Sequence, residues 1–194
     1  MIRLAHYSLD TFEGYWSHFP IKVQFSSPWG LMLMISNAKG ISQIEFLDSP
    51  LPDIPFVGRH ISPAYRENFQ SYPDNGIGGF DIFDNMQNAI NYLNGEKVQD
   101  DIFLYPSCTD FQFTVYQALL NIPEGTTANY KDVSASIGKP PATRAVATAI
   151  GLNKVAVLIP CHRVVPASGG YGKYRWRSGR KRAIITYEKQ RARH

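Results

Sequence analysis

The charges of this 194-residue chain are divided unevenly between its two halves. Residues 1–109 carry 6 basic and 12 acidic side chains, a net charge of −6, whereas residues 110–194 carry 14 basic and 4 acidic ones, a net charge of +10. The composition changes at the same place, and a chain of this length can bury one large core or two small ones. We therefore expect two domains, residues 1–108 and 109–194. The basic half has the electrostatic footprint of a polyanion binder, although a basic surface can also serve solubility alone.

The composition indicates a globular protein of a reducing compartment. Hydrophobic residues make up 44% of the chain and charged residues 19%, which is typical of folded rather than disordered chains. The apolar runs are too short to span a bilayer, and the N-terminus lacks the apolar stretch of a secretory signal. The two cysteines do not make a disulfide framework. We expect a cytoplasmic monomer with no membrane contact.

The first half combines strand and helix patterns. Short apolar segments are separated by the turn compositions Ser-Pro-Trp-Gly and Asn-Ala-Lys-Gly, which predicts strands joined by tight turns. These strands are expected over residues 21–25, 31–36 and 41–46. Residues 48–80 are rich in Pro, Asp, Asn and Gly and are typical of a long irregular connection. Residues 81–94 have apolar side chains at helical spacing before Gly95, which predicts a helix. An α/β domain with a small antiparallel sheet is expected.

The second half has the start and stop signals of short helices. Asp110 can cap a helix that ends before Pro123, and Asn129 with Asp132 resembles a cap for the next one. Pro141 suits the first turn of a further helix that runs to about residue 150. We expect a mainly helical domain whose last two of these helices, joined by Gly-Lys-Pro at 138–140, form a helix-turn-helix.

The second helix of this pair has an unusual outward face. Helical spacing directs one set of residues inward: Ala142, Ala145, Val146, Ala149 and Ile150. The outward set is Thr143, Arg144, Ala147 and Thr148. This outward face has a single long basic side chain among small ones and no Asn or Gln to read base edges. Small residues allow close approach to a shallow groove, but Arg144 can also be an ordinary solvated arginine.

A cysteine and a histidine are adjacent in the segment Ile-Pro-Cys-His-Arg-Val-Val, residues 159–165. Burial in such an apolar run raises the pKa of a thiol, so Cys161 needs a partner that takes its proton. His162 is next to it and is the candidate partner. The alternative is that Cys161 is simply a buried cysteine, as most free cysteines are.

The Pro-Cys-His-Arg-Val-Val motif is accompanied by an ordered set of further anchors. They are Phe111-Gln112, residues 115–119, residues 122–125, Tyr130, residues 144–146, Asn153, residues 172–174 and Glu188. Together these segments resemble the O6-alkylguanine-DNA alkyltransferases, which repair DNA by accepting an alkyl group on a cysteine. The resemblance is strong over residues 110–189 and weak over residues 23–47.

The resemblance implies roles for four residues at the thiol. Cys161 receives the alkyl group, His162 removes its proton through a bridging water, and Glu188 steadies the imidazole. Tyr130 hydrogen-bonds N3 of the departing base and supplies a proton. Alternatives remain, because Tyr130 can be a core tyrosine and Glu188 can pair with a helix-surface cation. The cations in question are Arg191 and Lys181.

On the DNA side, the resemblance implies a helix in the minor groove whose Arg144 takes the place of an extruded nucleotide. Thr143 and Thr148 share its outward face and are candidate DNA contacts. Asn153 is similar to the family's hinge asparagine, which ties this helix to the active-site strand. The family usually continues with proline, and Lys154 here leaves the turn geometry open.

The loop at residues 168–176 resembles the family's lid over the base pocket. The resemblance implies that Tyr174 packs on the extruded base and that the carbonyls of Val164 and Cys161 accept from its amino group. Trp176 and Arg177 stand where many members have glycine. Trp176 is expected to narrow the pocket towards bulky adducts, or else to anchor the last helix by packing, and Arg177 has no expected role.

No metal or other cofactor is expected. The histidines are scattered, Cys108 has no partner at zinc-ligand spacing, and no phosphate-binding glycine pattern occurs. The expected function is single-turnover transfer of an alkyl group from O6-alkylguanine, and from O4-methylthymine, in double-stranded DNA to Cys161. The alternatives are a damage sensor, which in that class lacks the cysteine, a cysteine hydrolase, which needs an oxyanion hole, and an added transcriptional duty.

Overall fold

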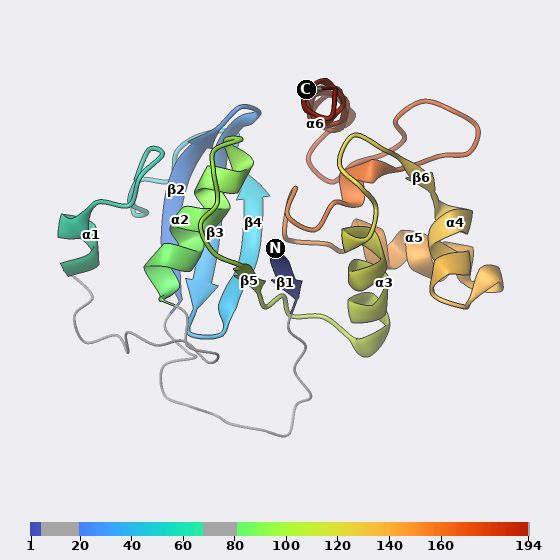
Figure 1. The fold of residues 1–194 in the computed structure, drawn as a ribbon, viewed down its shortest axis with the longest axis horizontal. Helices are drawn as coiled ribbons and strands as arrows, with labels where there is room; N and C mark the ends of the chain where they lie inside the picture. Colours follow the sequence, from blue (N-terminus) through green and yellow to red (C-terminus); the bar gives the residue numbers. More distant parts are fainter. Residues whose placement is uncertain (5–19, 68–80, 194) are drawn as a thin grey trace. The chain divides into compact units, whose positions relative to one another are not determined.

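The computed structural model describes residues 1–4, 20–67 and 81–193, and the chain divides into two compact units, Met1–Ser107 and Cys108–His194. A sheet dominates the first unit and helices dominate the second (Figure 1). The expected boundary lies one residue later, so Cys108 belongs to the second unit. None of the described helices combines the length and apolar character that a membrane crossing requires.

The described part of the first unit contains a five-stranded mixed sheet. From edge to edge its strands are β1 (Ile2–Leu4), β5 (Ile102–Leu104), β4 (Gly40–Phe46), β3 (Gly30–Asn37) and β2 (Ile21–Ser27). The predicted meander is present, because β2, β3 and β4 pair antiparallel. The sheet is larger than the expected antiparallel one and is mixed, since β5 pairs parallel with both β1 and β4. Pairing with distant segments, rather than local pattern, makes β1 and β5 strands.

The tight turns and the close packing of this sheet depend on glycine. Gly40 has a φ of 134° at the β3–β4 turn. A Cβ at this position would lie 2.7 Å from the backbone oxygen of Phe103 in β5. Only glycine therefore allows β4 to start where it does beside β5.

Helix α2 (Ile82–Leu93) packs on the sheet, as Figure 1 shows. Asp81 caps it by accepting from the backbone N–H of Asp84, and Gly95 follows its end with a φ of 75°, so the sequence signals for this helix were read correctly. The expected irregular connection at residues 48–80 contains the short helix α1 (Pro63–Glu67), and its remainder from residue 68 lies outside the described residues.

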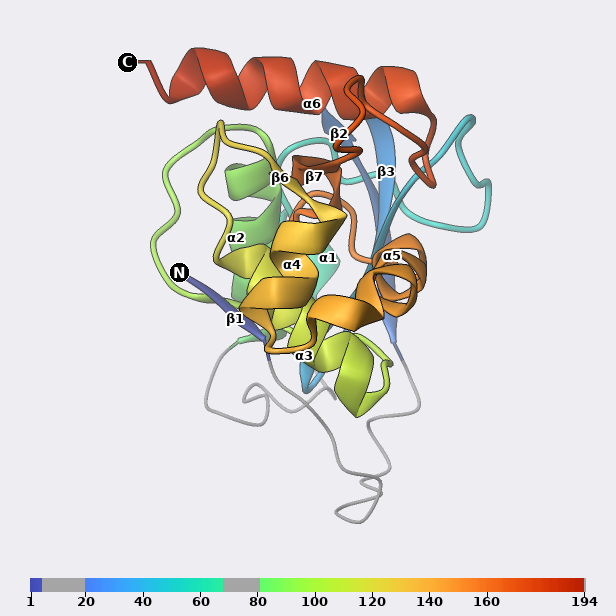
Figure 2. The same cartoon turned by 90° about the vertical axis from the view of Figure 1, so that its right-hand side faces the viewer.

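The second unit is mainly helical. Its elements are α3 (Asp110–Leu120), β6 (Ala128–Asn129), α4 (Tyr130–Ser136), α5 (Thr143–Gly151), β7 (Val164–Val165) and α6 (Ser178–Arg191), with 3-10 turns at Pro140–Ala142 and Cys161–Arg163. The cap of α3 is Thr109 in a capping box with Gln112, not Asp110 as expected, because a threonine hydroxyl one residue earlier serves the same backbone donors. Figure 2 shows α6 running past the short parallel pair of β6 and β7.

Helix α5 differs from expectation at its start and on one face. The prolines lie in the 3-10 turn that precedes it, so the α-helix begins at Thr143. Val146, Ala149 and Ile150 are buried as expected, but Ala145 is exposed. Ala145 precedes Val146 by about 100° of helical rotation, which turns it out of the narrow buried face of this short helix.

Candidate active site

Cys161 lines a pocket of about 270 Å³ in the second unit. Cys161 begins the 3-10 turn that follows Pro160, at the end of a segment that is buried from Val155 onwards. The other lining residues come from α4, α5, α6 and the loops between them: Tyr130, Ala147, Ile150, Gly151, Asn153, Lys173, Tyr174, Arg175 and Lys181. The pocket therefore brings together four of the predicted site residues, Cys161, Tyr130, Asn153 and Tyr174.

Asn153 fixes the backbone around the thiol. Its side-chain nitrogen lies 3.2 Å from the Cys161 sulfur, and also contacts the carbonyls of Val155 at 3.2 Å and Ile159 at 3.0 Å. Its side-chain oxygen accepts from the Val155 N–H at 2.9 Å. Burial raises the pKa of Cys161, and the Asn153 bond and the charge of Lys181 act against that rise. Asn153 thus ties the end of α5 to the segment that carries the thiol.

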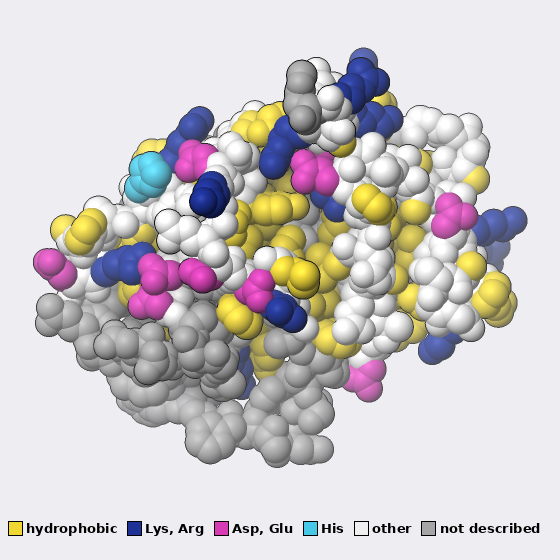
Figure 3. All heavy atoms as spheres, in the orientation of Figure 1, with side chains coloured by type: hydrophobic (Ala, Val, Ile, Leu, Met, Phe, Trp, Pro, Cys, Tyr) yellow, Lys and Arg dark blue, Asp and Glu magenta, His cyan; other side chains and the backbone are white. Residues whose placement is uncertain are grey.

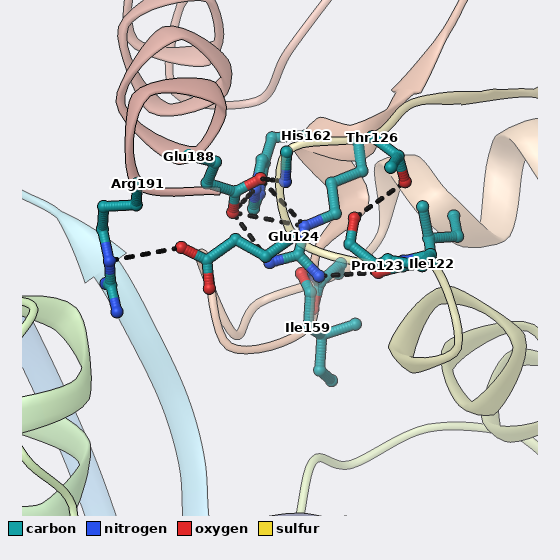
Figure 4. Close-up of polar contacts among 11 residues, drawn as sticks. Ile122, Pro123, Glu124, Thr126, Ile159, His162, Glu188 and Arg191 are labelled. Atoms are coloured by element: carbon teal, nitrogen blue, oxygen red, sulfur yellow. Dashed lines mark hydrogen bonds and ion pairs between the residues drawn. The ribbon is translucent and has the colours of Figure 1, made fainter. Parts of the chain in front are cut away.

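His162 is held by Glu188 of α6. The distance from His162 Nε2 to Glu188 Oε1 is 2.8 Å (Figure 4). Burial raises the pKa of Glu188, but hydrogen bonds from His162 and Arg163 outweigh it and bring the pKa to about 2. Glu188 is therefore a carboxylate that only accepts, which places the ring hydrogen of His162 on Nε2.

The other ring nitrogen of His162 is buried and has no hydrogen-bond partner among the described residues. Burial lowers the pKa of His162, although Glu188 acts in the opposite direction. The imidazole is therefore neutral at physiological pH, with the lone pair of Nδ1 open. Such a nitrogen can take a proton from a neighbouring thiol directly or through one water.

Arg163 completes this cluster, and the sequence interpretation missed it. Its Nε donates to Glu188 Oε2 at 3.0 Å, its Nη2 donates to Oε1 at 2.8 Å, and its Nη1 donates to the Ile122 carbonyl at 2.7 Å. A signal was present, because an arginine inside a buried segment needs an anion and Glu188 is the only acid after Asp132.

The alternative helix-surface partners of Glu188 do not contact it. Arg191 instead pairs with Glu124, with its Nε 3.5 Å from Glu124 Oε1 (Figure 4). The Nζ of Lys181 donates to the Val164 carbonyl at 2.6 Å. Glu188 therefore faces the protein interior, where the backbone N–H of Gly125 also reaches its Oε2 at 3.4 Å.

Two tyrosines, Tyr130 and Tyr174, line the pocket together with Cys161. Tyr130 opens α4 and is half-buried, and burial and the nearby Cys161 raise its pKa. Burial and Cys161 also raise the pKa of Tyr174 well above its usual value. The Tyr174 hydroxyl is buried and has no partner of full hydrogen-bond geometry among the described residues, and a weak hydrogen bond with Cys161 contributes to its raised pKa. Both hydroxyls are therefore protonated and able to donate to a ligand.

Trp176 lies behind this wall rather than in it. It packs edge-on against Tyr174 with ring centroids 5.2 Å apart, it is buried, and it does not line the pocket. The expectation that Trp176 itself narrows the pocket is therefore corrected: any effect on the pocket passes through Tyr174. The neighbouring Arg177 has a φ of 77° and a ψ of 137°, a conformation that suits glycine.

The predicted DNA-facing residues divide into two groups. Arg144 and Thr148 are exposed on α5, and Thr148 donates to the Arg144 carbonyl at 3.1 Å. The Thr143 hydroxyl instead bonds within the turn, to the Pro140 carbonyl at 3.2 Å and the Ser134 hydroxyl at 3.1 Å. The Val164 carbonyl, expected to accept from a base, already accepts from Lys181 and keeps one lone pair.

Within the described residues, no cluster of three or more His, Cys, Asp or Glu side chains could hold a metal ion. The reactive groups that line the pocket are the Cys161 thiol, the phenols of Tyr130 and Tyr174 and the amine of Lys181. Cys108, the other cysteine, is partly exposed and does not line the pocket.

Known proteins resemble this chain in sequence and in fold. Residues 110–190 match the family model of the 6-O-methylguanine DNA methyltransferase DNA-binding domain. A methylated-DNA–protein-cysteine methyltransferase of Mycobacterium tuberculosis is 36% identical over 156 residues, covering 75% of this chain and 92% of that protein. A methylated-DNA–protein-cysteine methyltransferase of Methanosarcina barkeri is 35% identical over 144 residues, covering 74% of this chain and 80% of that protein. The crystal structure of M. tuberculosis OGT in complex with DNA has a TM-score of 0.64 and 31% identity, covering 88% of this chain and 93% of that one.

Proposed function

We propose, for a chain that belongs to the methylated-DNA–protein-cysteine methyltransferase family, that Cys161 receives the alkyl group of O6-alkylguanine, and of O4-methylthymine, in double-stranded DNA. The observation that carries this assignment is a buried thiol in the pocket, next in the chain to a neutral His162 whose Nδ1 is open and whose Nε2 is held by Glu188. This arrangement makes a nucleophile from a thiol that burial alone would keep inert.

The reaction is a single displacement. The proton of Cys161 moves to His162 Nδ1 through a water, and the sulfur attacks the alkyl carbon. The S–C bond forms and the C–O6 bond breaks, with its electron pair left on the base. Tyr130 supplies a proton to the base and recovers one from the protonated His162, so that in sum the sulfur exchanges a proton for an alkyl group. A thioether has no leaving route, so each molecule acts once.

The DNA-binding part of the proposal concerns α4 and α5 as a helix-turn-helix. Helix α5 presents Arg144 among small side chains, which suits close approach to the minor groove and insertion of the arginine at the vacated base position. Three α5 residues, Ala147, Ile150 and Gly151, line the pocket, so an extruded base has a short path to Cys161. In Figure 3, Lys and Arg side chains flank α6 while acidic ones lie mostly over the first unit.

The remaining pocket groups bind the base. Tyr174 packs on the purine, with Trp176 bracing it from behind and so limiting how far the lid yields to bulky adducts. The free lone pair of the Val164 carbonyl and the Cys161 carbonyl accept from the exocyclic amine. Residues 109–194 form the DNA-binding and transfer domain, and Thr143 serves the turn of its helix pair.

One chain supplies every group that this reaction uses, and none of the steps calls on a cofactor. We therefore assign the activity to a monomer. A thiol that must stay reduced until it meets damage suits the cytoplasm.

The test is incubation with duplex DNA that carries isotopically labelled O6-methylguanine, followed by peptide mapping. One label per protein molecule should be found, on the peptide that contains Cys161. Repeated turnover would instead indicate a cysteine hydrolase or another enzyme, and binding without label transfer would indicate a damage sensor.

A further inference from the structure

Lys181 is a buried lysine in the wall of the pocket. Its side chain is 1% exposed, it lines the same cavity as the Cys161 sulfur, and its Nζ lies 6.0 Å from the centre of the Tyr174 ring. Its hydrogen bond to the Val164 carbonyl uses one of three ammonium donors. Lysine is almost never fully buried unless its charge is paired.

Lys181 pairs with no carboxylate in the described part of the chain. Glu188, the buried carboxylate of the described second unit, already accepts two bonds from the Arg163 guanidinium and one from His162. Glu188 and Arg163 therefore cancel, His162 is neutral, and the ammonium of Lys181 remains without a counter-charge. A buried site built in this way favours the arrival of one negative charge.

We infer that Lys181 is the positioning cation of the alkyl transfer, whose counter-charge is the Cys161 thiolate and then the negative charge that develops on the departing base. This inference rests on the proposed function and deepens it. Lys181 keeps its proton throughout, so it adds no proton-transfer step. The Lys181 ammonium stabilises the Cys161 thiolate in a cavity whose burial otherwise disfavours charged groups.

The electrostatics of the two groups agree with this pairing. Burial lowers the pKa of Lys181 and the Cys161 thiolate raises it, while burial raises the pKa of Cys161 and the Lys181 charge lowers it. No acidic side chain faces the sulfur from the pocket walls. The other titratable or charged groups around Cys161 are Tyr116 on α3, Tyr130 on α4, His162 beside it, and Lys173, Tyr174 and Arg175 of the lid loop.

The test measures the ionisation of Cys161 without DNA. Wild-type protein, Lys181→Met and Lys181→Arg are alkylated with iodoacetamide between pH 5 and 10, and the rate at Cys161 is followed by peptide mass spectrometry. Arg182→Met, an exposed neighbour on α6, is the matched control. Loss of the ammonium should move the midpoint of the pH–rate profile upward by about one pH unit. The alkylation rate of Lys181→Met should therefore be about tenfold lower than that of the wild type at neutral pH and equal to it at high pH. The Arg variant and the control should keep the wild-type midpoint.

An unchanged midpoint in a Lys181→Met protein with a wild-type circular-dichroism spectrum would overturn the inference. If that variant does not fold, the ¹³Cε resonance of Lys181 in the wild-type protein decides. This resonance should shift as Cys161 ionises, and the shift should vanish once Cys161 has been alkylated. A resonance that does not respond to the ionisation of Cys161 would also overturn the inference. Because neither readout uses DNA, failure of methyl transfer to Cys161 would count against the proposed function alone.

Discussion

The two units bury polar side chains of different kinds. In the described part of the first unit the buried polar residues are neutral, whereas the second unit buries His162, Arg163, Lys181 and Glu188. The same contrast holds for the backbone. The residues with positive φ in the described first unit are glycines, and the two that are not glycine, Val157 and Arg177, both belong to the second unit.

The buried amides of the first unit are braces. Asn85 on α2 donates to the Phe103 carbonyl at 3.0 Å and accepts from the Phe103 N–H at 2.7 Å. Gln24 in β2 holds the backbone of Leu51 through both its nitrogen and its oxygen, each at 2.7 Å. A satisfied amide links two segments at little net cost in free energy. Buried charge and backbone strain are costly, and their concentration around Cys161 indicates that the second unit is shaped by its chemistry.

The largest effect should come from the proposed acceptor itself. Cys161→Ala should abolish methyl transfer from duplex O6-methylguanine while leaving DNA affinity largely intact, because phosphate contacts dominate affinity. Transfer is measured with labelled DNA and affinity by fluorescence anisotropy. Cys108→Ala, the matched control in the same unit, should transfer fully. Loss of transfer in the control would mean that the acceptor is misassigned.

Glu188 in the second unit and Asn85 in the first should affect different properties, the transfer rate and the stability. Glu188→Gln should lower the transfer rate about 100-fold, because the amide no longer holds His162 as a proton acceptor. Asn85→Ala should leave the transfer rate per folded molecule unchanged, but should lower the free energy of unfolding by about 1–3 kcal/mol, because it strands two buried backbone groups. Single-turnover kinetics and urea unfolding measure the two quantities. A slower transfer in folded Asn85→Ala protein would break the contrast between the units.

Within the second unit, Arg144 should affect the extrusion of the base from duplex DNA and not the transfer chemistry itself. Arg144→Ala should slow repair of duplex DNA at least tenfold, yet hardly change the reaction with free O6-methylguanine, since only the duplex requires a base to be extruded. Rates with the two substrates are compared in the same variant. Equal slowing with both would assign Arg144 a structural or chemical role instead.

Local pattern was enough to predict the meander of β2, β3 and β4, helix α2 and the Asn129 cap, because turn residues, periodicity and capping pairs act over a few residues. It failed for β1 and β5, which are three residues each and are defined by partners far along the chain. It also named Asp110 where Thr109 caps α3, since both residue types suit an N-cap.

Candidate site residues could be predicted from the sequence where they belong to a recognisable motif, but not where their role depends on being buried. Cys161 and His162 stand out in the sequence, whereas the roles given to Glu188, Tyr130 and Asn153 came from the family resemblance. Lys181 was interpreted as a helix-surface cation and Arg163 was given no role, because arginine and lysine are usually exposed. Only the path of α6 over the Cys161–Arg163 turn shows that both are buried.

The buried charges also predict a pH dependence of stability. The pKa of His162 is lowered by burial, so below about pH 6.5 the unfolded chain binds a proton at His162 that the folded chain does not bind. The free energy of unfolding should therefore fall as pH drops below about 6.5, by at most about 1.4 kcal/mol per pH unit. Glu188, with its pKa depressed to about 2, adds stability that is complete above its ordinary pKa and is lost as pH falls towards 2. Urea unfolding at pH 7.5, 5.5 and 3.5 measures both steps. His162→Gln should lack the first step, and its persistence would place the responsible group elsewhere.

The smallest effect should come from the strained backbone of Arg177. Its φ of 77° and ψ of 137° belong to a region that is essentially reserved for glycine and costs other residues about 1–3 kcal/mol. Arg177→Gly should therefore be more stable than Arg177→Ala by about 1 kcal/mol in thermal or urea unfolding. The alanine variant is the matched control, because both changes remove the arginine side chain with all its contacts and differ only at Cβ. Gly40→Ala in the first unit should likewise lower stability, since its Cβ would meet the Phe103 oxygen at 2.7 Å. Equal stability of the glycine and alanine variants at position 177 would show that the second unit relaxes this strain, and would leave buried charge alone to distinguish the two units.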